Sequence, residues 1–189
     1  MKVLVLNGSP RKHGTVATLL RAVAEGAAAN HEVEWIDVYS LRMQPCVACM
    51  MCRIGGKCVL PADDAHVVGR KIREAEALIV GTPTHWGNMS ALLKLLFDRN
   101  VTAFVTERGS GLPAPRHKGQ KAVIVSACAT PWPLSILAPQ SRGAVRAVKE
   151  VLGLSGYRII GRVVKAGTKR VPGVSQRLIA EARSLGERL

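Results

Sequence analysis

Five short, mainly apolar segments constrain the fold of this 189-residue chain more than any other feature. Short apolar runs that end at Gly, Pro, Asn or Asp are typical of strands buried inside a parallel sheet. The predicted strands are Lys2–Leu6, Val33–Val38, Ala77–Gly81, Ala122–Ala127 and Tyr157–Val164. Because helical patterns alternate with these strands, we expect an α/β fold with a three-layer, doubly wound, five-stranded parallel sheet.

Apolar residues at helical spacing predict the helices, and acidic or hydroxyl residues are suited to cap some of them. The predicted helices start at Thr15, run from Asp63 or Asp64 to Ala75, from Ser90 to Arg99, from Arg142 to Leu152, and from Val174 to Leu189. We expect one domain over residues 1–189, with a cysteine-rich insertion at about 40–61. Residues 106–119, rich in Gly, Pro and basic residues, are long for a connection and are expected to form a functional or interface loop.

The chain is strongly basic, with 27 Lys and Arg against 13 Asp and Glu and a formal charge of +14. Such a charge raises the expectation of nucleic-acid binding. However, aromatic residues make up only 4% of the chain and no run of consecutive lysines occurs, which argues against a surface that stacks on bases. A solvated positive face and a docking surface for anions or an acidic protein both remain open.

No uncharged apolar run reaches the roughly 18 to 20 residues that cross a bilayer. The first apolar segment continues directly into GSPRKHG, which does not resemble a cleavable signal peptide. We therefore expect no membrane association and a cytoplasmic location. In that compartment, clustered cysteines indicate metal or redox chemistry rather than disulfides.

Four of the five cysteines lie within thirteen residues, at a spacing of CxxCxxCx5C. The candidate metal ligands are Cys46, Cys49, Cys52 and Cys58. Three closely spaced thiolates can surround one iron-sulfur cubane, and two glycines before the fourth cysteine allow the chain to turn back. Zinc is the main alternative, although structural zinc sites usually separate two CxxC pairs by a longer spacer. Free or packed thiols are a third interpretation.

In a doubly wound sheet, ligands bind beyond the carboxyl ends of the strands. The loop GSPRKHGT after the first strand lacks both the GxGxxG and the GK[ST] phosphate motifs. The hydroxyls of Ser9 and Thr15, the guanidinium of Arg11 and the amides of the following helix could still bind one phosphate. Alternatively, the glycines and the proline of this loop shape a tight turn and nothing more.

The loops after the third and fourth strands reach the same edge of the sheet. The first of them offers an aromatic ring between small and amide side chains, which could form a wall beside a planar ring system; core packing is the alternative for this tryptophan. The second could present backbone amides to the edge of such a ring. The candidate residues are Pro83, Thr84, His85, Trp86, Gly87 and Asn88 in the first loop, and Ala127, Cys128 and Thr130 in the second.

Three separated motifs, GSPRKHGT, GTPTHWGNMSALLKLLFDR and PCVACMMCRIGGKCVLPADD, resemble those of the flavodoxin-like NADPH-dependent FMN reductases, specifically their iron-sulfur flavoprotein branch. The resemblance covers roughly residues 1–130. It implies FMN, with Ser9, Arg11 and Thr15 at the phosphate and the 83–88 loop near the ribityl chain and ring. Two departures are Val16, where a hydroxyl is usual, and His85, where Tyr is common.

The resemblance further implies an FMN-dependent oxidoreductase that carries a 4Fe-4S cluster on the four clustered cysteines. NAD(P)H or an acidic ferredoxin would supply electrons, and oxygen, peroxide, a quinone or free flavin would accept them. The flavin carries the chemistry, so we assign no catalytic side chain. A homodimer or homotetramer is expected. The alternatives are a cluster-free NADPH-dependent FMN or quinone reductase and, more distantly, a zinc-stapled basic module that binds nucleic acid.

Overall fold

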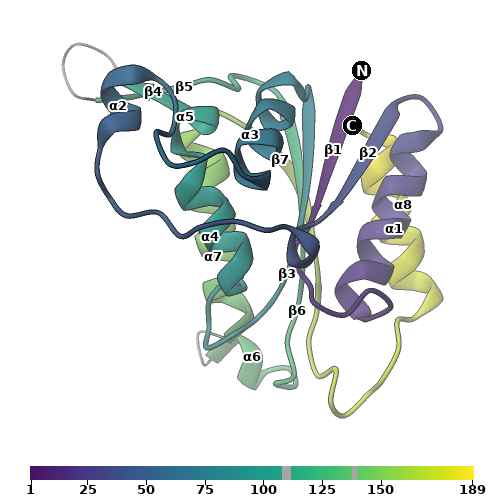
Figure 1. The fold of residues 1–189 in the computed structure, drawn as a ribbon. Coiled ribbons are helices and arrows are strands. Elements are labelled where there is room, and N and C mark those ends of the chain that lie inside the picture. The colour runs from purple at the N-terminus through teal and green to yellow at the C-terminus, as the bar shows by residue number, and fades with distance from the viewer. Residues whose placement is uncertain (108–111, 138–139) are drawn as a thin grey trace.

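The computed structural model describes residues 1–107, 112–137 and 140–189, and its centre is a five-stranded parallel sheet (Figure 1). The strand order is β2-β1-β3-β6-β7, and every neighbouring pair is parallel. The strands are β1 (Lys2–Asn7), β2 (Glu32–Asp37), β3 (Ala77–Pro83), β6 (Lys121–Ala127) and β7 (Arg158–Lys165). This order is the flavodoxin type, so the predicted fold class is confirmed. All five predicted strands are present, with ends that differ by at most two residues.

Helices cover both faces of the sheet, as Figure 1 shows. On one face lie α1 (Thr15–Ala28) and α8 (Gln176–Glu187), and on the other lie α3 (Asp64–Glu74), α4 (Ala91–Arg99), α5 (Val101–Phe104) and α7 (Gln140–Leu154). Each face has its own hydrophobic cluster. The helices α1 and α8 approach closely because Gly26 and Gly186 carry no side chain: a Cβ at Gly186 would lie 2.0 Å from the Val23 carbonyl oxygen.

Three connecting segments contain short elements that sequence periodicity did not predict. A 3-10 turn, η1 (Val38–Ser40), follows β2, and α2 (Met51–Gly55) lies inside the predicted insertion. The segment predicted as a loop at 106–119 includes parts of an antiparallel pair, β4 (Val105–Glu107) with β5 (Pro113–Pro115), while its residues 108–111 lie outside the described part. A short helix, α6 (Leu134–Leu137), precedes α7. No helix in the described ranges is long and apolar enough to cross a bilayer.

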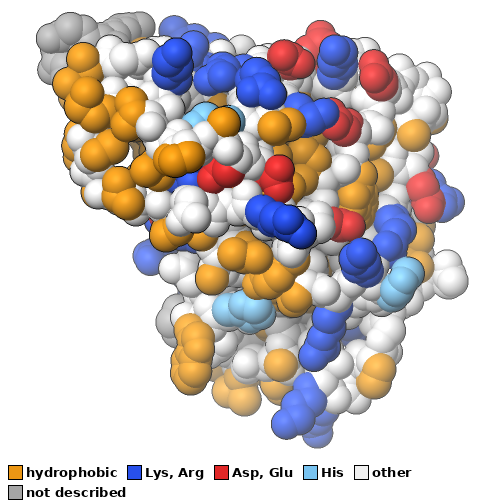
Figure 2. Space-filling model, in the orientation of Figure 1, with side chains coloured by type: hydrophobic (Ala, Val, Ile, Leu, Met, Phe, Trp, Pro, Cys, Tyr) orange, Lys and Arg blue, Asp and Glu red, His pale blue; other side chains and the backbone are white. Residues whose placement is uncertain are grey.

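The cysteine-bearing segment runs across the face that carries α4 and reaches α2, at the upper left of Figure 1. Figure 2 shows hydrophobic side chains gathered on the surface in that region. The exposed apolar residues of the segment are Val47, Met50, Met51, Ile54 and Val59. Ala48 and Met50 both have positive φ, at 52° and 59°. The segment therefore buries few of its own apolar side chains, in contrast to the two core clusters.

Candidate functional site

The strand order reverses between β1 and β3, and the loops after these strands flank the crevice where ligands bind in such sheets. Backbone and side-chain hydrogen bonds hold the two loops together. The Gly8 amide donates to the Gly81 carbonyl at 2.8 Å, and the Ser90 hydroxyl donates to the Gly8 carbonyl at 2.7 Å. Ser90 precedes α4 as predicted, but its side chain does not cap the helix because it is bonded to Gly8.

The first loop leaves a hydroxyl and a helix N-terminus available to an anion. The Asn7 side-chain oxygen accepts the Ser9 amide at 3.1 Å, and the Ser9 hydroxyl oxygen accepts the Arg11 amide at 3.2 Å. The hydroxyl hydrogen of Ser9 therefore remains free to donate. Gly14 offers no side chain to cap α1, and no acidic residue occupies the first turn, which begins at Thr15. These features suit a phosphate at the helix N-terminus.

Val16 does not take part in this arrangement. Its side chain is buried in the cluster between α1 and the sheet. The hydroxyl that is usual at this position in the resembling loops is thus replaced by core packing, and the remaining donors of the loop are Ser9, Arg11, Thr15 and the first-turn amides. Arg11 itself is exposed at the surface.

The second loop closes in a tight turn at its tip. The amides of His85 and Asn88 each donate to the other's carbonyl at 2.9 Å, while Trp86 and Gly87 have φ of 51° and 73°. Positive φ at both central residues defines a type I′ turn. The Trp86 side chain is fully exposed, at 102% of its reference area, so the core-packing alternative for this residue is wrong.

Gly143 of α7 packs directly against the backbone of this turn at Gly87. A Cβ at Gly143 would lie 1.8 Å from the carbonyl oxygen of Gly87, so the helix and the turn can touch only because residue 143 has no side chain. Sequence reasoning did not identify this residue, since a glycine inside a helical pattern gives no indication of its neighbour.

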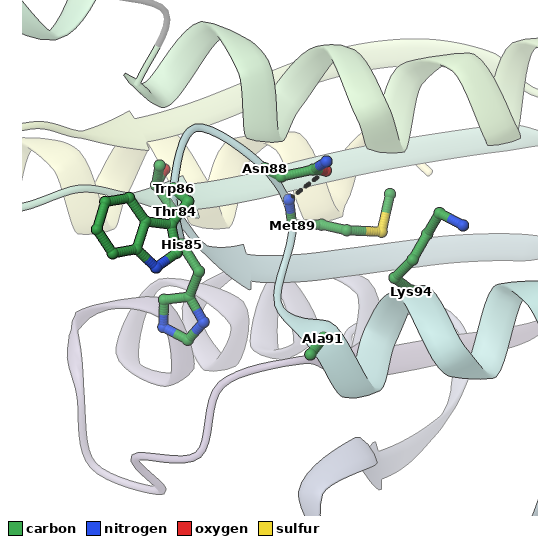
Figure 3. A pocket seen from close by; sticks show the side chains of 7 residues that line it. All are labelled: Thr84, His85, Trp86, Asn88, Met89, Ala91 and Lys94. Atoms are coloured by element: carbon green, nitrogen blue, oxygen red, sulfur yellow. Dashed lines mark hydrogen bonds between the residues drawn. The ribbon is translucent and has the colours of Figure 1, made fainter. Parts of the chain in front are cut away.

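An open cavity of about 550 Å³ lies along the second loop (Figure 3). It is lined by Thr84, His85, Trp86, Asn88, Met89, Ala91 and Lys94. In Figure 3 the rings of His85 and Trp86 lie at one end of the loop, and Lys94 projects from α4 at the other. The Thr84 hydroxyl is buried and has no hydrogen-bond partner among the described residues, as expected for a group that awaits a polar ligand.

The predicted phosphate residues and the predicted ring residues lie on neighbouring loops but not in one cavity. Ser9, Arg11 and Thr15 are absent from the cavity lining, which comes from the loop after β3 and from the first turn of α4. The junction between the two groups is the bond from Ser90 to Gly8. A ligand that spans both would therefore follow the surface of the crevice from the N-terminus of α1 toward the 85–88 turn.

The loop after β6 is tied to the end of β7. Cys128 is 4% exposed, its amide donates to the Lys165 carbonyl at 3.0 Å, and its thiol lies 3.4 Å from the Thr130 carbonyl. The Cys128 amide is thus engaged within the protein, which removes one of the amides predicted to face a ring edge. Ala127 contributes differently: its carbonyl accepts the Thr84 amide at 2.8 Å and joins this loop to the second one.

The four clustered cysteines are free thiols at or near the surface. Cys46 and Cys49 are exposed, and Cys52 and Cys58 are partly buried. Burial raises the pKa of the Cys52 thiol, and the charges of Cys58, Cys46 and Cys49 raise it further, which places the four thiols within electrostatic reach of one another. Among the described residues, however, no three His, Cys, Asp or Glu side chains are gathered closely enough to ligate one metal ion.

A buried ion pair fixes the start of α3 beside these cysteines. The Asp63 carboxylate accepts from both terminal nitrogens of Arg99, at 2.7 and 3.1 Å, and from the Gln44 amide at 3.0 Å. Burial alone would raise the pKa of Asp63, but the bonds from Gln44, Arg99 and His66 outweigh it and lower the pKa to about 2. Asp63 caps α3 as predicted, through a 3.1 Å bond from the Ala65 amide.

Arg99 is the residue of this region that sequence reasoning missed. Its side chain is completely buried, although it stands last in an amphipathic helix where an arginine normally faces solvent. The polar DD pair at residues 63 and 64 was interpreted only as a helix cap. A carboxylate that can serve both as a cap and as a counter-ion gives no distinct sequence signal.

Comparisons with known proteins agree with these features. A family model described as NADPH-dependent FMN reductase matches residues 1–155. An iron-sulfur flavoprotein of Methanocaldococcus jannaschii is 38% identical over 101 residues, which cover 53% of this chain and 52% of the relative. An NAD(P)H dehydrogenase (quinone) of Methanosarcina barkeri is 30% identical over 191 residues, covering 92% of this chain and 89% of the relative.

The fold has close structural counterparts at low identity. The solved structure of an NAD(P)H:quinone oxidoreductase from Methanothermobacter marburgensis superposes with a TM-score of 0.74 at 23% identity, over 99% of this chain and 98% of the other. The chain spans about half the length of the iron-sulfur flavoproteins that it matches. The family resemblance found in the sequence motifs is confirmed.

Proposed function

The chain belongs to the NADPH-dependent FMN reductase family, and from this premise we propose that it is an FMN-dependent oxidoreductase. The observation that carries the proposal is the pairing of an uncapped helix N-terminus beside the Ser9 hydroxyl with an unpartnered, buried Thr84 hydroxyl across the same crevice. The amides at the helix N-terminus could bind an anion, and the Thr84 hydroxyl could bond to a polar group. A ligand that is anionic at one end and polar along its length would satisfy both sites.

The first loop would hold the phosphate of FMN. Ser9 donates its free hydroxyl hydrogen, Thr15 offers a second hydroxyl at the start of α1, and the first-turn amides point toward the anion. The Arg11 guanidinium, exposed beside them, contributes a charge-assisted contact. Because Asn7 orients Ser9 through its amide, the loop keeps this arrangement before the ligand arrives.

The 83–88 loop and the loop after β6 would hold the ribityl chain and the ring. Thr84 donates to the chain, and the type I′ turn keeps the His85 and Trp86 rings outside the core, where they can contact a planar ring. Pro83, Gly87 and Asn88 shape the wall, and Ala127, Cys128 and Thr130 lie at the adjacent strand end. Bound FMN would supply hydride acceptance and the transfer of one or two electrons.

The four clustered cysteines would hold a 4Fe-4S cluster. The donor type fits, since all four are free thiols, but among the described residues they are not gathered around one point, so the exposed segment that carries them would have to draw in to ligate a common group. The names of the iron-sulfur flavoprotein relatives support this assignment. NAD(P)H or an acidic ferredoxin would supply electrons, attracted by the positive surface, and oxygen, peroxide, a quinone or free flavin would accept them.

The deciding experiment is anaerobic purification followed by flavin identification and analysis of iron, sulfide and zinc. FMN together with iron and sulfide supports the full proposal. FMN without iron or sulfide identifies a cluster-free NADPH-dependent FMN or quinone reductase, for which the quinone-reductase relative offers support. Zinc without flavin, accompanied by salt-sensitive DNA binding, would overturn the proposal in favour of a nucleic-acid-binding module.

We also propose that a second copy of the chain helps to cover the flavin, as a homodimer or homotetramer. Large apolar side chains stand exposed at the ligand-binding edge, among them Trp86, Trp132, Leu134 and Leu137. Light scattering of the FMN-loaded protein should give a mass of at least twice 20.2 kDa. A monomer at micromolar concentration would contradict this assembly.

A further inference from the structure

The last residues of β1 and β2 are joined by a side-chain hydrogen bond. Asn7 and Asp37 are register partners in this parallel pair, and Asn7 Nδ2 donates to Asp37 Oδ1 at 2.7 Å. The Trp35 indole nitrogen donates to the same carboxylate oxygen at 2.8 Å. Asn7 is fully buried and Asp37 is half-buried. One oxygen of Asp37 therefore accepts from two donors at the point where the proposed phosphate-binding loop begins.

The Asp37 carboxylate decides which way the Asn7 amide group points. A carboxylate has only acceptor atoms, whereas a carboxamide has an acceptor oxygen on one side and a donor nitrogen on the other. Only the NH₂ group of Asn7 can therefore face Asp37, and this leaves the Asn7 oxygen to accept the Ser9 amide at 3.1 Å. The opposite orientation would bring two oxygens together at Asp37 and two N–H donors together at Ser9, where burial makes such mismatches costly.

Ser9 connects this orientation to the hydroxyl that the proposed flavin site uses. The side chain of Ser9 is buried, and its hydroxyl oxygen accepts the Arg11 amide at 3.2 Å, which leaves the hydroxyl hydrogen to donate to a phosphate. The bond from the Ser9 amide to Asn7 fixes the backbone that carries this hydroxyl. A rotated Asn7 amide would break that bond and release the hydroxyl from its position.

The other end of the same loop is also tied to β2. Nη2 of Arg21, on α1, donates to the Lys12 carbonyl at 2.5 Å, and the Arg21 guanidinium carbon lies 5.6 Å from the centre of the Trp35 ring. The face of the Trp35 ring thus attracts the cation that holds Lys12, while its nitrogen holds Asp37. Both ends of the loop are therefore connected to β2 through one tryptophan.

Attraction between charges does not explain a carboxylate at this place. A negative charge near the N-terminus of α1 repels a phosphate, and Asp37 forms no ion pair within the described part of the chain. We propose that Asp37, held by Trp35, is a positioning residue that fixes the Asn7 amide and thereby gives the crevice its preference for a phosphorylated flavin over an unphosphorylated one. This inference rests on the proposed FMN site.

The expected advantage is preorganisation of the loop. A donor that is already held in place loses less conformational freedom when the ligand binds, so more of its interaction with the phosphate appears as affinity. The advantage concerns the phosphate alone, because Asn7 and Ser9 lie in the first loop and are absent from the cavity lining beside the 83–88 loop.

The test compares FMN with riboflavin, which share the ring and the ribityl chain and differ in the phosphate. In Asp37→Ala, fluorescence titration of the flavin-free protein should show FMN affinity reduced at least about tenfold and riboflavin affinity unchanged within about twofold. Before any flavin is added, the Ser9 amide should exchange its hydrogen faster than in the wild type, as measured by NMR, because its acceptor is no longer fixed.

Asp37→Asn is the matched control, because it removes the charge and retains an oxygen that both donors can reach. We expect its FMN affinity to stay within about threefold of the wild type, with normal protection of the Ser9 amide. If Asp37 acted through its charge, both variants would bind FMN at least as tightly as the wild type, since repulsion of the phosphate would be removed. That result would overturn the proposal.

A second variant keeps the proposal testable if Asp37→Ala does not fold. Trp35→Phe removes the N–H that holds Asp37 and keeps an aromatic ring beside Arg21. Its FMN affinity should fall at least about threefold while its riboflavin affinity stays unchanged. An equal loss for both flavins, in either variant, would indicate general damage to the crevice and would overturn the role assigned to Asp37.

The remaining outcomes separate this inference from the proposed function. A wild-type protein that binds neither flavin, or binds FMN no more tightly than riboflavin, overturns the phosphate site and this inference with it. A wild-type protein that prefers FMN and keeps the whole of that preference in Asp37→Ala overturns only the role of Asp37.

Discussion

Replacing Asp63 by Asn should destabilise the protein strongly, although the substitution preserves shape and helix-capping ability. The Asp63 side chain is 14% exposed and forms a bidentate pair with the completely buried Arg99 side chain. Removing one partner of a buried pair costs about 3 to 5 kcal/mol because the other charge is left uncompensated. Asn can retain some of the hydrogen bonds and remains a good N-cap, so we expect a loss of about 3 kcal/mol at pH 7.

The pH dependence gives an independent measure of the same interaction. The pKa of Asp63 is lowered from 3.8 to about 2 in the folded protein. A carboxyl with a lower pKa in the folded state contributes its full stabilisation above the unfolded pKa and loses it as pH falls toward the folded pKa. This contribution is about 2 kcal/mol at pH 7 and about half of that at pH 3. The difference between wild type and Asp63→Asn should therefore shrink as pH falls through this window.

Urea unfolding of flavin-free, metal-free protein at pH 7 and pH 3 is the appropriate assay, because bound cofactors disturb two-state behaviour. The neighbouring Asp64→Asn variant is the control: this carboxylate accepts the Arg42 amide at 2.7 Å but has no buried counter-ion, and its loss should cost less than about 1 kcal/mol. A loss below about 1 kcal/mol for Asp63→Asn, or a loss that does not change with pH, would refute the interpretation of this ion pair.

Three further changes test the flavin crevice. Gly143→Ala places a Cβ 1.8 Å from the Gly87 carbonyl oxygen, so fluorescence titration should show FMN affinity reduced at least about tenfold by displacement of the turn, about 1.4 kcal/mol. Its control, Gly153→Ala in the same helix, meets open space and should keep that affinity while stabilising the fold by about 0.5 to 1 kcal/mol. Trp86→Ala should change the free energy of unfolding by less than about 0.5 kcal/mol, since the side chain is fully exposed; a larger loss would contradict its position. Thr15→Val, nearly isosteric, should weaken FMN binding by about 0.5 to 1.5 kcal/mol in isothermal titration without a change in melting temperature, and unchanged affinity would remove this hydroxyl from the phosphate site.

The sheet could be predicted from sequence because its signal is local and repeated. Each strand is a short apolar run, and burial on both faces of a parallel sheet requires such runs whatever the neighbours are. The short elements gave no such signal. The helix α2 has five residues, and β4 and β5 have three each, so neither a helical nor an alternating period can develop within them.

Candidate site residues could be proposed from the sequence where their chemistry lies in consecutive residues, and not where it depends on contacts between distant segments. The loop that contains Ser9 and Thr15 carries its hydroxyls within a few residues of the helix start. From the sequence Trp86 could also have been a core residue, and the structure shows instead that it lies in a turn with positive φ and is fully exposed. The contact of Gly143 with Gly87 joins residues more than fifty positions apart and has no local signature.

The helix α4 connects the two candidate cofactor regions, and its sequence is constrained at both ends for different reasons. At its start, Ser90 is bonded to Gly8 of the proposed phosphate-binding loop, and at its end, Arg99 is bonded to Asp63 beside the cysteines. Between these points Leu93 and Leu96 are fully buried in the core. Nine residues at a rise of 1.5 Å per residue span about 13 Å, so the separation of the two ends is set by a rigid element rather than by a loop. A shift of α4 against the sheet should therefore displace both regions together, whereas a change confined to the exposed segment around α2 should affect the cysteines alone.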